Sequence, residues 1–205
     1  MKIKLTAKDF VYLLTIFVLM ISLAYFFYEL MSYKKIAMNL SKQAEYLEKH
    51  RKIVYKSEYY TKMSQLVWGK ESRRCDAGLI LKIEKLVQQI DSTLNVDDVL
   101  ALITIESGFN NYAVSNAKAL GLMQILYSTA KGIDTTIKEE DLFNEDINLR
   151  IGITYLSKLK KQFEGNLELA LIAYNRGPGR LIAEMMNDDV KRKYSKSVSK
   201  IKGSF

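Results

Sequence analysis

The longest mainly apolar run lies near the start of the chain, at residues 10–28, where no position carries a charge. As a helix, this stretch would extend about 28 Å at 1.5 Å per residue, which is close to the ~30 Å of a bilayer core. Aromatic residues crowd its C-terminal end, as they do at a membrane interface. The pattern favours an uncleaved membrane anchor at residues 10–31 over a cleaved signal peptide or a buried helix of a soluble core.

The pattern divides the rest of the chain into three further parts. A short tail at 1–9 precedes the anchor, a charged stretch at 32–75 follows it, and a compact domain is expected at 76–205. The charged stretch predicts a helical stalk, whose broken heptad seam weakly indicates self-association or contact with a partner protein. The seam positions are Ile36, Leu40, Gln43, Leu47, His50 and Val54.

Apolar residues recur at helical spacing through the compact domain. The pattern predicts helices at 79–90, 96–106, 147–162 and 167–174, with Asn95 as the N-cap of the second. Strand-like alternation is nearly absent, and the chain holds a single proline. The expected fold class is therefore all-α.

Composition narrows the chemistry. The chain has one cysteine, Cys75, and one histidine, His50, so no disulfide, zinc cluster or histidine-rich metal site is expected, and no cofactor is implied. A net charge of +8 favours an anionic partner. Nucleic acid is a poor fit because no groove-reading motif accompanies the charge. A basic C-terminal tail would attract anionic wall polymer or lipid, or form a solvated helix face: Lys191, Arg192, Lys193, Lys196, Lys200 and Lys202.

Glu106 is the carboxylate that the pattern singles out. It continues the apolar face formed by Val99, Leu102 and Ile103, and Ser107 and Gly108 end the helix directly after it. A carboxylate on an apolar face loses solvation, which raises its pKa toward the range of a general acid. The alternative from position alone is a helix-end glutamate that reaches water.

The surrounding motifs carry a resemblance. The segment 106–125 reads ESGFNNYAVSNAKALGLMQI, and a second block at 168–180 reads ELALIAYNRGPGR. Between them lies INLRIGITYL, and Tyr194 is followed by Val198 near the end. Four blocks in this order and spacing, over roughly residues 80–200, resemble the soluble lytic transglycosylase (SLT) family, the goose-type-lysozyme-like murein transglycosylases.

This resemblance implies a lysozyme-like helical domain with Glu106 as the single catalytic carboxylate. Glu106 would protonate the glycosidic oxygen between N-acetylmuramic acid and N-acetylglucosamine, and would then deprotonate the sugar's 6-hydroxyl as a 1,6-anhydro ring closes. The resemblance also places Tyr174 within hydrogen-bond reach of Glu106, gives Ser107 an orienting or binding role, and has Gln124 bind an acetamido group. The substrate-binding set it implies is Ser107, Ser115, Met123, Gln124, Tyr174, Asn175 and Tyr194.

The sequence departs from the family pattern at two places in this region. Lys118 stands where the family usually has glycine, and Leu126 and Tyr127 replace a Met-Pro pair, which puts one part of the cleft wall in doubt. A second carboxylate from the group Asp134, Glu139, Glu140 and Asp141 would be available only if a loop folds back.

The expected function is therefore a peptidoglycan lytic transglycosylase. It is anchored in the cytoplasmic membrane by one span, with its catalytic domain on the extracytoplasmic side, where its glycan substrate lies. The alternatives are a hydrolytic muramidase, a wall-binding component of an envelope-spanning machine without activity, and a tethered coiled-coil partner protein. The flanking lysines are nearly balanced, so the sidedness is inferred from the substrate rather than from charge.

Overall fold

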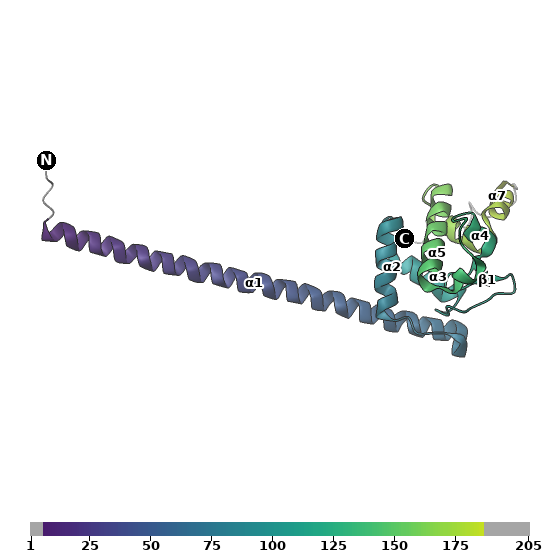
Figure 1. Ribbon diagram of the computed structural model, residues 1–205, viewed down its shortest axis with the longest axis horizontal. Coiled ribbons are helices and arrows are strands. Elements are labelled where there is room, and N and C mark those ends of the chain that lie inside the picture. The colour runs from purple at the N-terminus through teal and green to yellow at the C-terminus, as the bar shows by residue number, and fades with distance from the viewer. Residues whose placement is uncertain (1–5, 187–205) are drawn as a thin grey trace, which may run out of the picture. The chain divides into compact units, whose positions relative to one another are not determined.

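The structure, a computed structural model, describes residues 6–186. Its described residues form two compact units, which meet between residues 53 and 54. One helix, α1 (Ala7–Trp68), contributes to both of them. Figure 1 shows this helix without interruption along its length.

The first unit contains the apolar part of α1. An 18-residue window of this helix has a mean hydropathy of 2.4, and none of the window is buried. Length and composition therefore qualify the helix as a candidate membrane span, as the sequence predicts.

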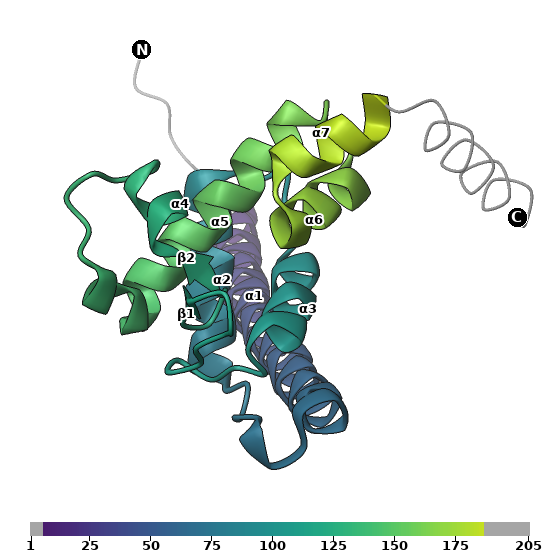
Figure 2. The ribbon, with the colours of Figure 1, turned by 90° about the vertical axis from the view of Figure 1, so that its right-hand side faces the viewer.

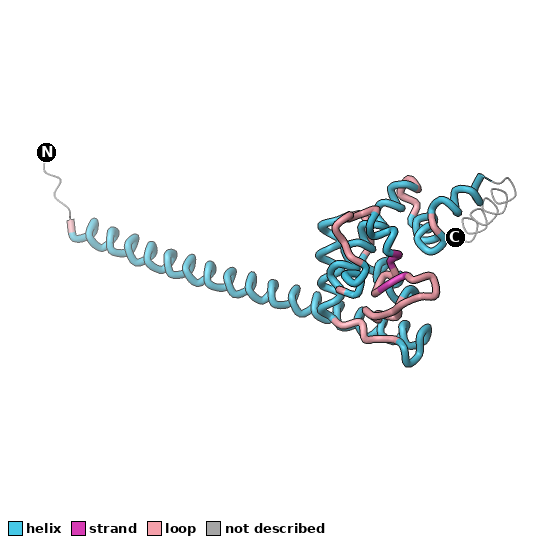
Figure 3. Tube along the Cα trace, turned by 45° about the vertical axis from the view of Figure 1, so that its right-hand side comes forward, coloured by secondary structure: helices cyan, strands magenta, loops and turns pink. Residues whose placement is uncertain are grey.

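The second unit consists mainly of helices joined by loops (Figure 3). Its only strands among the described residues are the two-residue β1 and β2, so the all-α prediction is confirmed. The elements are the 3₁₀ helix η1 (Gly69–Glu71), α2 (Ala77–Ile90), α3 (Val96–Glu106), β1 (Ala119–Leu120), β2 (Ile125–Leu126), α4 (Tyr127–Lys131), the 3₁₀ helix η2 (Glu139–Phe143), α5 (Glu145–Gln162), α6 (Leu167–Arg176) and α7 (Pro178–Met186).

Polar side chains fix the starts of the main helices. The Asn95 side chain accepts a hydrogen bond from the Asp97 amide at 3.0 Å, which confirms Asn95 as the N-cap of α3. Asp76, Asn144 and Asn166 cap α2, α5 and α6 in the same manner. Each cap satisfies an amide that has no partner inside its helix. The four predicted helices are therefore present, with ends that differ by a few residues.

Helix α5 organises the core of this unit. It contacts α2 on one side, α6 on another and η2 near its start, and it crosses the domain between α4 and α6 in Figure 2. Most of its apolar residues are buried, as is much of the predicted stripe on α2. Burial of each such side chain contributes about 1.5–3 kcal/mol. The fully buried members on the two helices include Ile80, Ile83, Leu149, Ile151, Ile153 and Leu156.

The second unit begins before the predicted domain boundary. The sequence placed the start of the domain at residue 76, whereas the unit begins at residue 54. The reason is local packing: Tyr60 and Ser64 are buried, and Ser57 donates a hydrogen bond to the Cys75 carbonyl at 2.6 Å. The C-terminal part of the predicted stalk is therefore part of the domain's packed structure.

Candidate active site

Helix α3 places Glu106 at its last turn. The buried face of α3 consists of apolar residues, including Val99 and Ile103, and Glu106 continues that face. The backbone then turns away at Gly108 and Phe109, which both have positive φ angles, of 57° and 64°. Phe109 is buried, and its packing holds the strained turn in place. The helix thus ends with a carboxylate at the mouth of a sharply turned loop.

Burial without a compensating partner defines the electrostatics of Glu106. Loss of solvation raises the pKa of its carboxyl group to about 7. No salt bridge or hydrogen bond to its side chain occurs within the described residues. The negative end of the α3 dipole acts in the same direction, because it disfavours a negative charge at the helix C-terminus. Near neutral pH, Glu106 is therefore able both to give up and to accept a proton.

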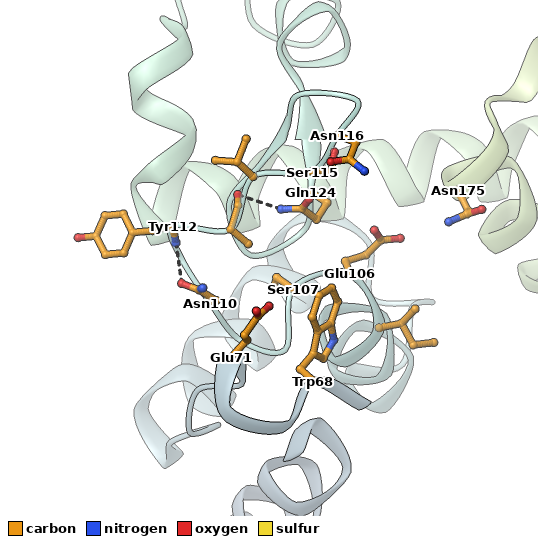
Figure 4. Close-up of a pocket in the computed structure, with 13 residues that line it drawn as sticks. Trp68, Glu71, Glu106, Ser107, Asn110, Tyr112, Ser115, Asn116, Gln124 and Asn175 are labelled. Carbon is orange, nitrogen blue, oxygen red and sulfur yellow. Dashed lines mark hydrogen bonds between the residues drawn. The ribbon is translucent and has the colours of Figure 1, made fainter. Parts of the chain in front are cut away.

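Glu106 lines a cavity of about 570 Å³, which lies within the size range of ligand pockets. Figure 4 shows its carboxylate directed into this space. The cavity is formed by the loop 110–116, the C-terminal ends of α1, η1 and α3, one residue just before β2 and one residue of α6. The residues that line it are Trp68, Glu71, Ile105, Glu106, Ser107, Asn110, Tyr112, Ala113, Val114, Ser115, Asn116, Gln124 and Asn175.

The lining combines neutral amides with apolar surface. Four of these residues carry side-chain amides, which both donate and accept hydrogen bonds: Asn110, Asn116, Gln124 and Asn175. Trp68, Ile105, Tyr112 and Val114 supply apolar or aromatic surface. Among the described residues, no lysine or arginine lines the cavity. This chemistry suits a neutral polar ligand with amide groups better than a phosphate.

The two predicted serines have their hydroxyl groups engaged by the backbone. The Ser107 hydroxyl donates to the Leu122 carbonyl at 2.7 Å, so it joins the end of α3 to the loop before β2 rather than to Glu106. The Ser115 hydroxyl accepts from the Ala119 amide at 3.0 Å and closes a tight turn. Both residues line the cavity, but their hydroxyls mainly stabilise its wall.

Gln124 presents one free side of its amide to the cavity. Its amide nitrogen donates to the carbonyl of Ala113 at 3.1 Å (Figure 4) and to that of Gly121 at 2.9 Å, which uses both of its protons. The carbonyl oxygen of the same amide has no protein donor within the described residues and is available to accept an N–H group. Gln124 has φ 49°, so the backbone of this turn is itself unusual. The free oxygen is compatible with the predicted hydrogen bond to an acetamido group, whose N–H would donate to it.

The sequence predictions for the side chains of Met123 and Tyr174 need correction. Met123 is fully buried, and its side chain packs where a Cβ on Gly152 would come within 2.3 Å of its sulfur. The Tyr174 hydroxyl donates to the Met123 carbonyl at 2.8 Å, not to Glu106. Burial is the main cause that raises the pKa of Tyr174 well above its usual value, followed by the charge of Glu106. Tyr174 therefore lies near Glu106 but supports the turn beneath it.

Asn148 is a supporting residue whose role the sequence did not reveal. It is buried in α5, and its side chain accepts from the Met123 amide at 2.8 Å. It also donates to the carbonyls of Leu120 (2.9 Å) and Leu142 (2.8 Å). A Cβ on Gly121, which has φ 75°, would lie 2.3 Å from the Asn148 amide nitrogen. One side chain thus ties the β1–β2 turn to α5 and η2, and glycine is required beside it.

Most of the residues that build the site belong to a segment shared with known proteins. Residues 87–197 match the model of the family described as the transglycosylase SLT domain, which is more than half of the chain. The chain belongs to the transglycosylase SLT family. The prediction of this family from the motif blocks is confirmed.

Two solved structures are similar to this chain. One is an inactive mutant of the lytic transglycosylase Slt from Pseudomonas aeruginosa, at 32% identity over 51% of this chain, with a TM-score of 0.48. The other is the 70 kDa soluble lytic transglycosylase from Escherichia coli, at 28% identity over 50% of this chain, with a TM-score of 0.46. The match covers 18% of the length of each of those chains.

The remaining sequence predictions fall into three groups. Asn175 lines the cavity from α6, on the side opposite the loop 110–116 (Figure 4). Tyr194 and the basic tail lie outside the described residues. Tyr127 does not line the cavity: it begins α4, the first helical position that proline favours, and its hydroxyl donates to the Ile137 carbonyl at 3.4 Å. The candidates for a second carboxylate do not line the cavity either: Asp134, Glu139, Glu140 and Asp141.

Sequence reasoning missed the contribution of residues before the family segment. Trp68 and Glu71 both line the cavity, although the sequence assigned them to the stalk. A helical pattern in a charged stretch gives no signal of tertiary packing. The single tryptophan of the chain was the available hint, since a large aromatic side chain in a polar helix often packs against another part of the protein.

Proposed function

We propose that the chain is a membrane-anchored peptidoglycan lytic transglycosylase that cleaves the β-1,4 bond between N-acetylmuramic acid and N-acetylglucosamine without water. The observation that carries the proposal is Glu106, a half-buried carboxyl group with a pKa raised to about 7 in an amide-lined cavity of an SLT-family chain. A general acid with this pKa remains substantially protonated near neutral pH.

In the first step, the protonated Glu106 carboxyl group gives its proton to the glycosidic oxygen. The bond from that oxygen to C1 of the muramoyl residue breaks, and the sugar ring develops oxocarbenium character. The departing N-acetylglucosamine leaves as an alcohol, and Glu106 becomes a carboxylate. The low polarity that raised its pKa also strengthens the attraction between this carboxylate and the positive ring.

In the second step, the 6-hydroxyl of the same muramoyl residue attacks C1. The Glu106 carboxylate takes the hydroxyl proton as the 1,6-anhydro bond forms, so the enzyme returns to its starting state and no water is consumed. The attacking group is already tethered to the reacting ring, and such intramolecular reactions reach effective molarities of roughly 10⁵ M and above. One carboxyl group is therefore sufficient for both proton transfers.

A hydrolytic muramidase is the nearest alternative. It would need a positioned water or a covalent intermediate, commonly with a second carboxylate flanking the bond. Glu71 is the only other carboxylate among the described residues that line the cavity, and it is exposed. An exposed carboxylate stays solvated, so it is a weak general base toward a water molecule inside the cavity. The anhydro-forming reaction is therefore the one proposed.

The apolar helix supplies the proposed location. With α1 as a single membrane span, the catalytic unit would act on the extracytoplasmic side of the cytoplasmic membrane, on glycan strands of the wall. Self-association or an envelope-machine partner through the exposed face of α1 remains a further prediction. Equal gel-filtration mass of detergent-solubilised wild type and a Leu40→Lys, Leu47→Lys variant would contradict self-association through the seam.

The test of the activity uses the full chain in a mild detergent, because Trp68 and Glu71, which precede the family segment, line the cavity. Purified peptidoglycan is incubated with the wild type and with Glu106→Gln, and the released muropeptides are identified by mass spectrometry. We expect anhydro-muropeptides from the wild type and none from the variant. Reducing-end products would replace the proposal with the muramidase, and retained sacculus binding without products would replace it with the non-catalytic wall-binding protein.

A further inference from the structure

Residues 54–71 precede the segment matched by the SLT family, which begins at residue 87, yet they pack against the start of α3. The Lys56 ammonium group lies 2.9 Å from the Asp97 carboxylate, and the Tyr60 hydroxyl donates to the Asp97 carbonyl at 3.1 Å. The Cys75 amide in turn donates to the Thr61 hydroxyl at 3.1 Å. These contacts hold the end of α1 in a defined position along α3.

Trp68 lies directly against the turn that follows the catalytic glutamate. Its indole N–H donates to the Thr104 carbonyl at 2.8 Å, one of the last four carbonyls of α3, which lack partners inside the helix. A Cβ on Gly108 would lie 2.7 Å from Cδ1 and 2.8 Å from Cγ of the indole. The absence of a side chain at Gly108 thus lets the ring approach the backbone within two residues of Glu106.

Part of the indole remains accessible. Trp68 is half-buried, and its remaining surface lines the same cavity as Glu106, as Figure 4 shows for the two labelled side chains. Glu71, on η1 at the same wall, adds an exposed carboxylate that accepts hydrogen bonds. A β-linked pyranose has an apolar face of C–H groups and a rim of hydroxyls. This wall therefore offers a ring for the face and an acceptor for the rim.

We propose that Trp68 is a substrate-contacting residue, whose indole ring stacks on one sugar of the glycan strand beside Glu106. The Glu71 carboxylate accepts a hydrogen bond from a hydroxyl group of that sugar. Residues 54–71 then complete a cleft that the family segment alone leaves open on one side. This inference rests on the proposed function, since it assigns part of the binding site for the same strand.

The rival role for Trp68 is structural support of the Gly108 turn. The two roles differ in what they change. A support that holds the turn would alter folding stability and the turnover number, because Glu106 would move. A stacking surface would alter the affinity for glycan and leave the turnover of bound substrate nearly unchanged, since the interaction is made equally in the ground and transition states.

The chain contains a single tryptophan, so its fluorescence reports on this wall alone. The full-length Glu106→Gln chain in detergent is titrated with soluble, uncross-linked glycan strands freed of their peptides, and with cellohexaose as a β-1,4-linked control without acetamido groups. We expect a saturable change in emission with the wall strands. Binding of the strands by calorimetry with no change in emission would overturn the role of Trp68.

Kinetics then separate affinity from support. For Trp68→Ala, removal of the stacked apolar surface should raise KM for soluble strands about tenfold while kcat stays within about twofold. Leu66→Ala, which truncates an 80% exposed side chain on the same turn, should match the wild type. A Trp68→Ala chain with normal KM and lowered kcat would assign Trp68 to support of the turn and overturn the stacking role.

The outcomes also separate this inference from the proposed function. Anhydro-muropeptides from the wild type together with unchanged emission and normal KM in Trp68→Ala would reject the stacking role alone. A wild type that releases no anhydro-muropeptides would reject the proposed function and, with it, the inference that rests on it.

Discussion

Replacement of Glu106 by glutamine should stabilise the protein at high pH while it abolishes activity. The carboxyl group has a pKa of about 7 in the folded chain, against an ordinary value of 4.5. Below pH 4.5 it is protonated in both the folded and unfolded states, so it makes no pH-dependent contribution. Between these values the folded state keeps a proton that the unfolded state releases. The folding stability of the wild type therefore falls as pH rises through the pKa of the folded state.

The magnitude follows from the size of this pKa shift. One pKa unit corresponds to about 1.4 kcal/mol, so the full shift corresponds to roughly 3 kcal/mol. Because the side chain is in part exposed, solvent screening lowers this to about 2–3 kcal/mol. Glutamine has nearly the same shape and no charge. The difference in unfolding free energy between Glu106→Gln and the wild type should thus grow by about 2–3 kcal/mol from pH 4.5 to pH 8.5.

Urea denaturation of the full chain in detergent, followed by the fluorescence of Trp68, measures this difference at each pH. The emission of this residue reports on the catalytic unit, since Trp68 packs within it. A neutral-surface control such as Gln65→Glu, at an exposed position of α1, should show no such trend. If the difference between Glu106→Gln and the wild type is the same at pH 5 and pH 8.5, the argument that burial raises the pKa of Glu106 is wrong.

Four further predictions follow from the same structure. The kcat/KM of the wild type should fall as pH rises through about 7, as Glu106 loses its proton, and a profile without this limb would contradict its role as general acid. Asn148→Ala should lower the unfolding free energy by roughly 3 kcal/mol or more, because three buried backbone groups lose their partner; urea denaturation checks it. Lys118→Gly should raise the unfolding free energy by about 0.5–1 kcal/mol, because Lys118 has φ 63°, a conformation that glycine adopts without steric cost. A lower melting temperature of this variant would contradict the prediction. Tyr174→Phe should cost about 1 kcal/mol in urea denaturation and leave the pH profile in place, because the hydroxyl bonds to Met123; a displaced profile would restore the predicted bond to Glu106.

The sequence predicts the helices well because each has a local signal. The stripe on α2, the apolar run of α3 and the N-cap Asn95 depend on residues within one or two turns of one another. The short elements lack such signals. Strands β1 and β2 have two residues each, too few for an alternating pattern, and they pair because Asn148 and Ser107 hold the turn between them.

The residues of the candidate site were likewise predicted where a local motif marks them and missed where only tertiary contacts define them. Glu106 and Gln124 are found from motifs, and both line the cavity. Met123 belongs to the same motif, but its side chain turns into the core because Gly152 leaves room for it there. No pattern of residue types distinguishes a motif residue that faces a ligand from one that packs beneath it. Trp68 was missed for the opposite reason, since it acts through tertiary contacts outside any motif.

The departure at Lys118 illustrates how a family pattern gains physical meaning from the structure. The position requires a left-handed backbone, with φ 63°, in the turn closed by Ser115. Glycine adopts this conformation without steric cost, which accounts for the usual family residue. The lysine side chain is exposed, so the substitution strains the backbone and leaves the cavity unaltered.

The strongest argument for a functional Glu106 is its contrast with three ion-paired acidic residues of the same unit. Asp97 pairs with Lys56, Asp134 with Arg150, and Glu145 with Lys82. Within the described residues Glu106 alone of these four is held in an apolar setting with no cation or donor, and its pKa rises in consequence. A structural carboxylate would be expected to lose such a costly arrangement, because a neutral residue would stabilise the fold. A carboxyl group with a raised pKa in a cavity lined with amides has the property that a general acid needs, and this supports the proposal that Glu106 is the proton donor.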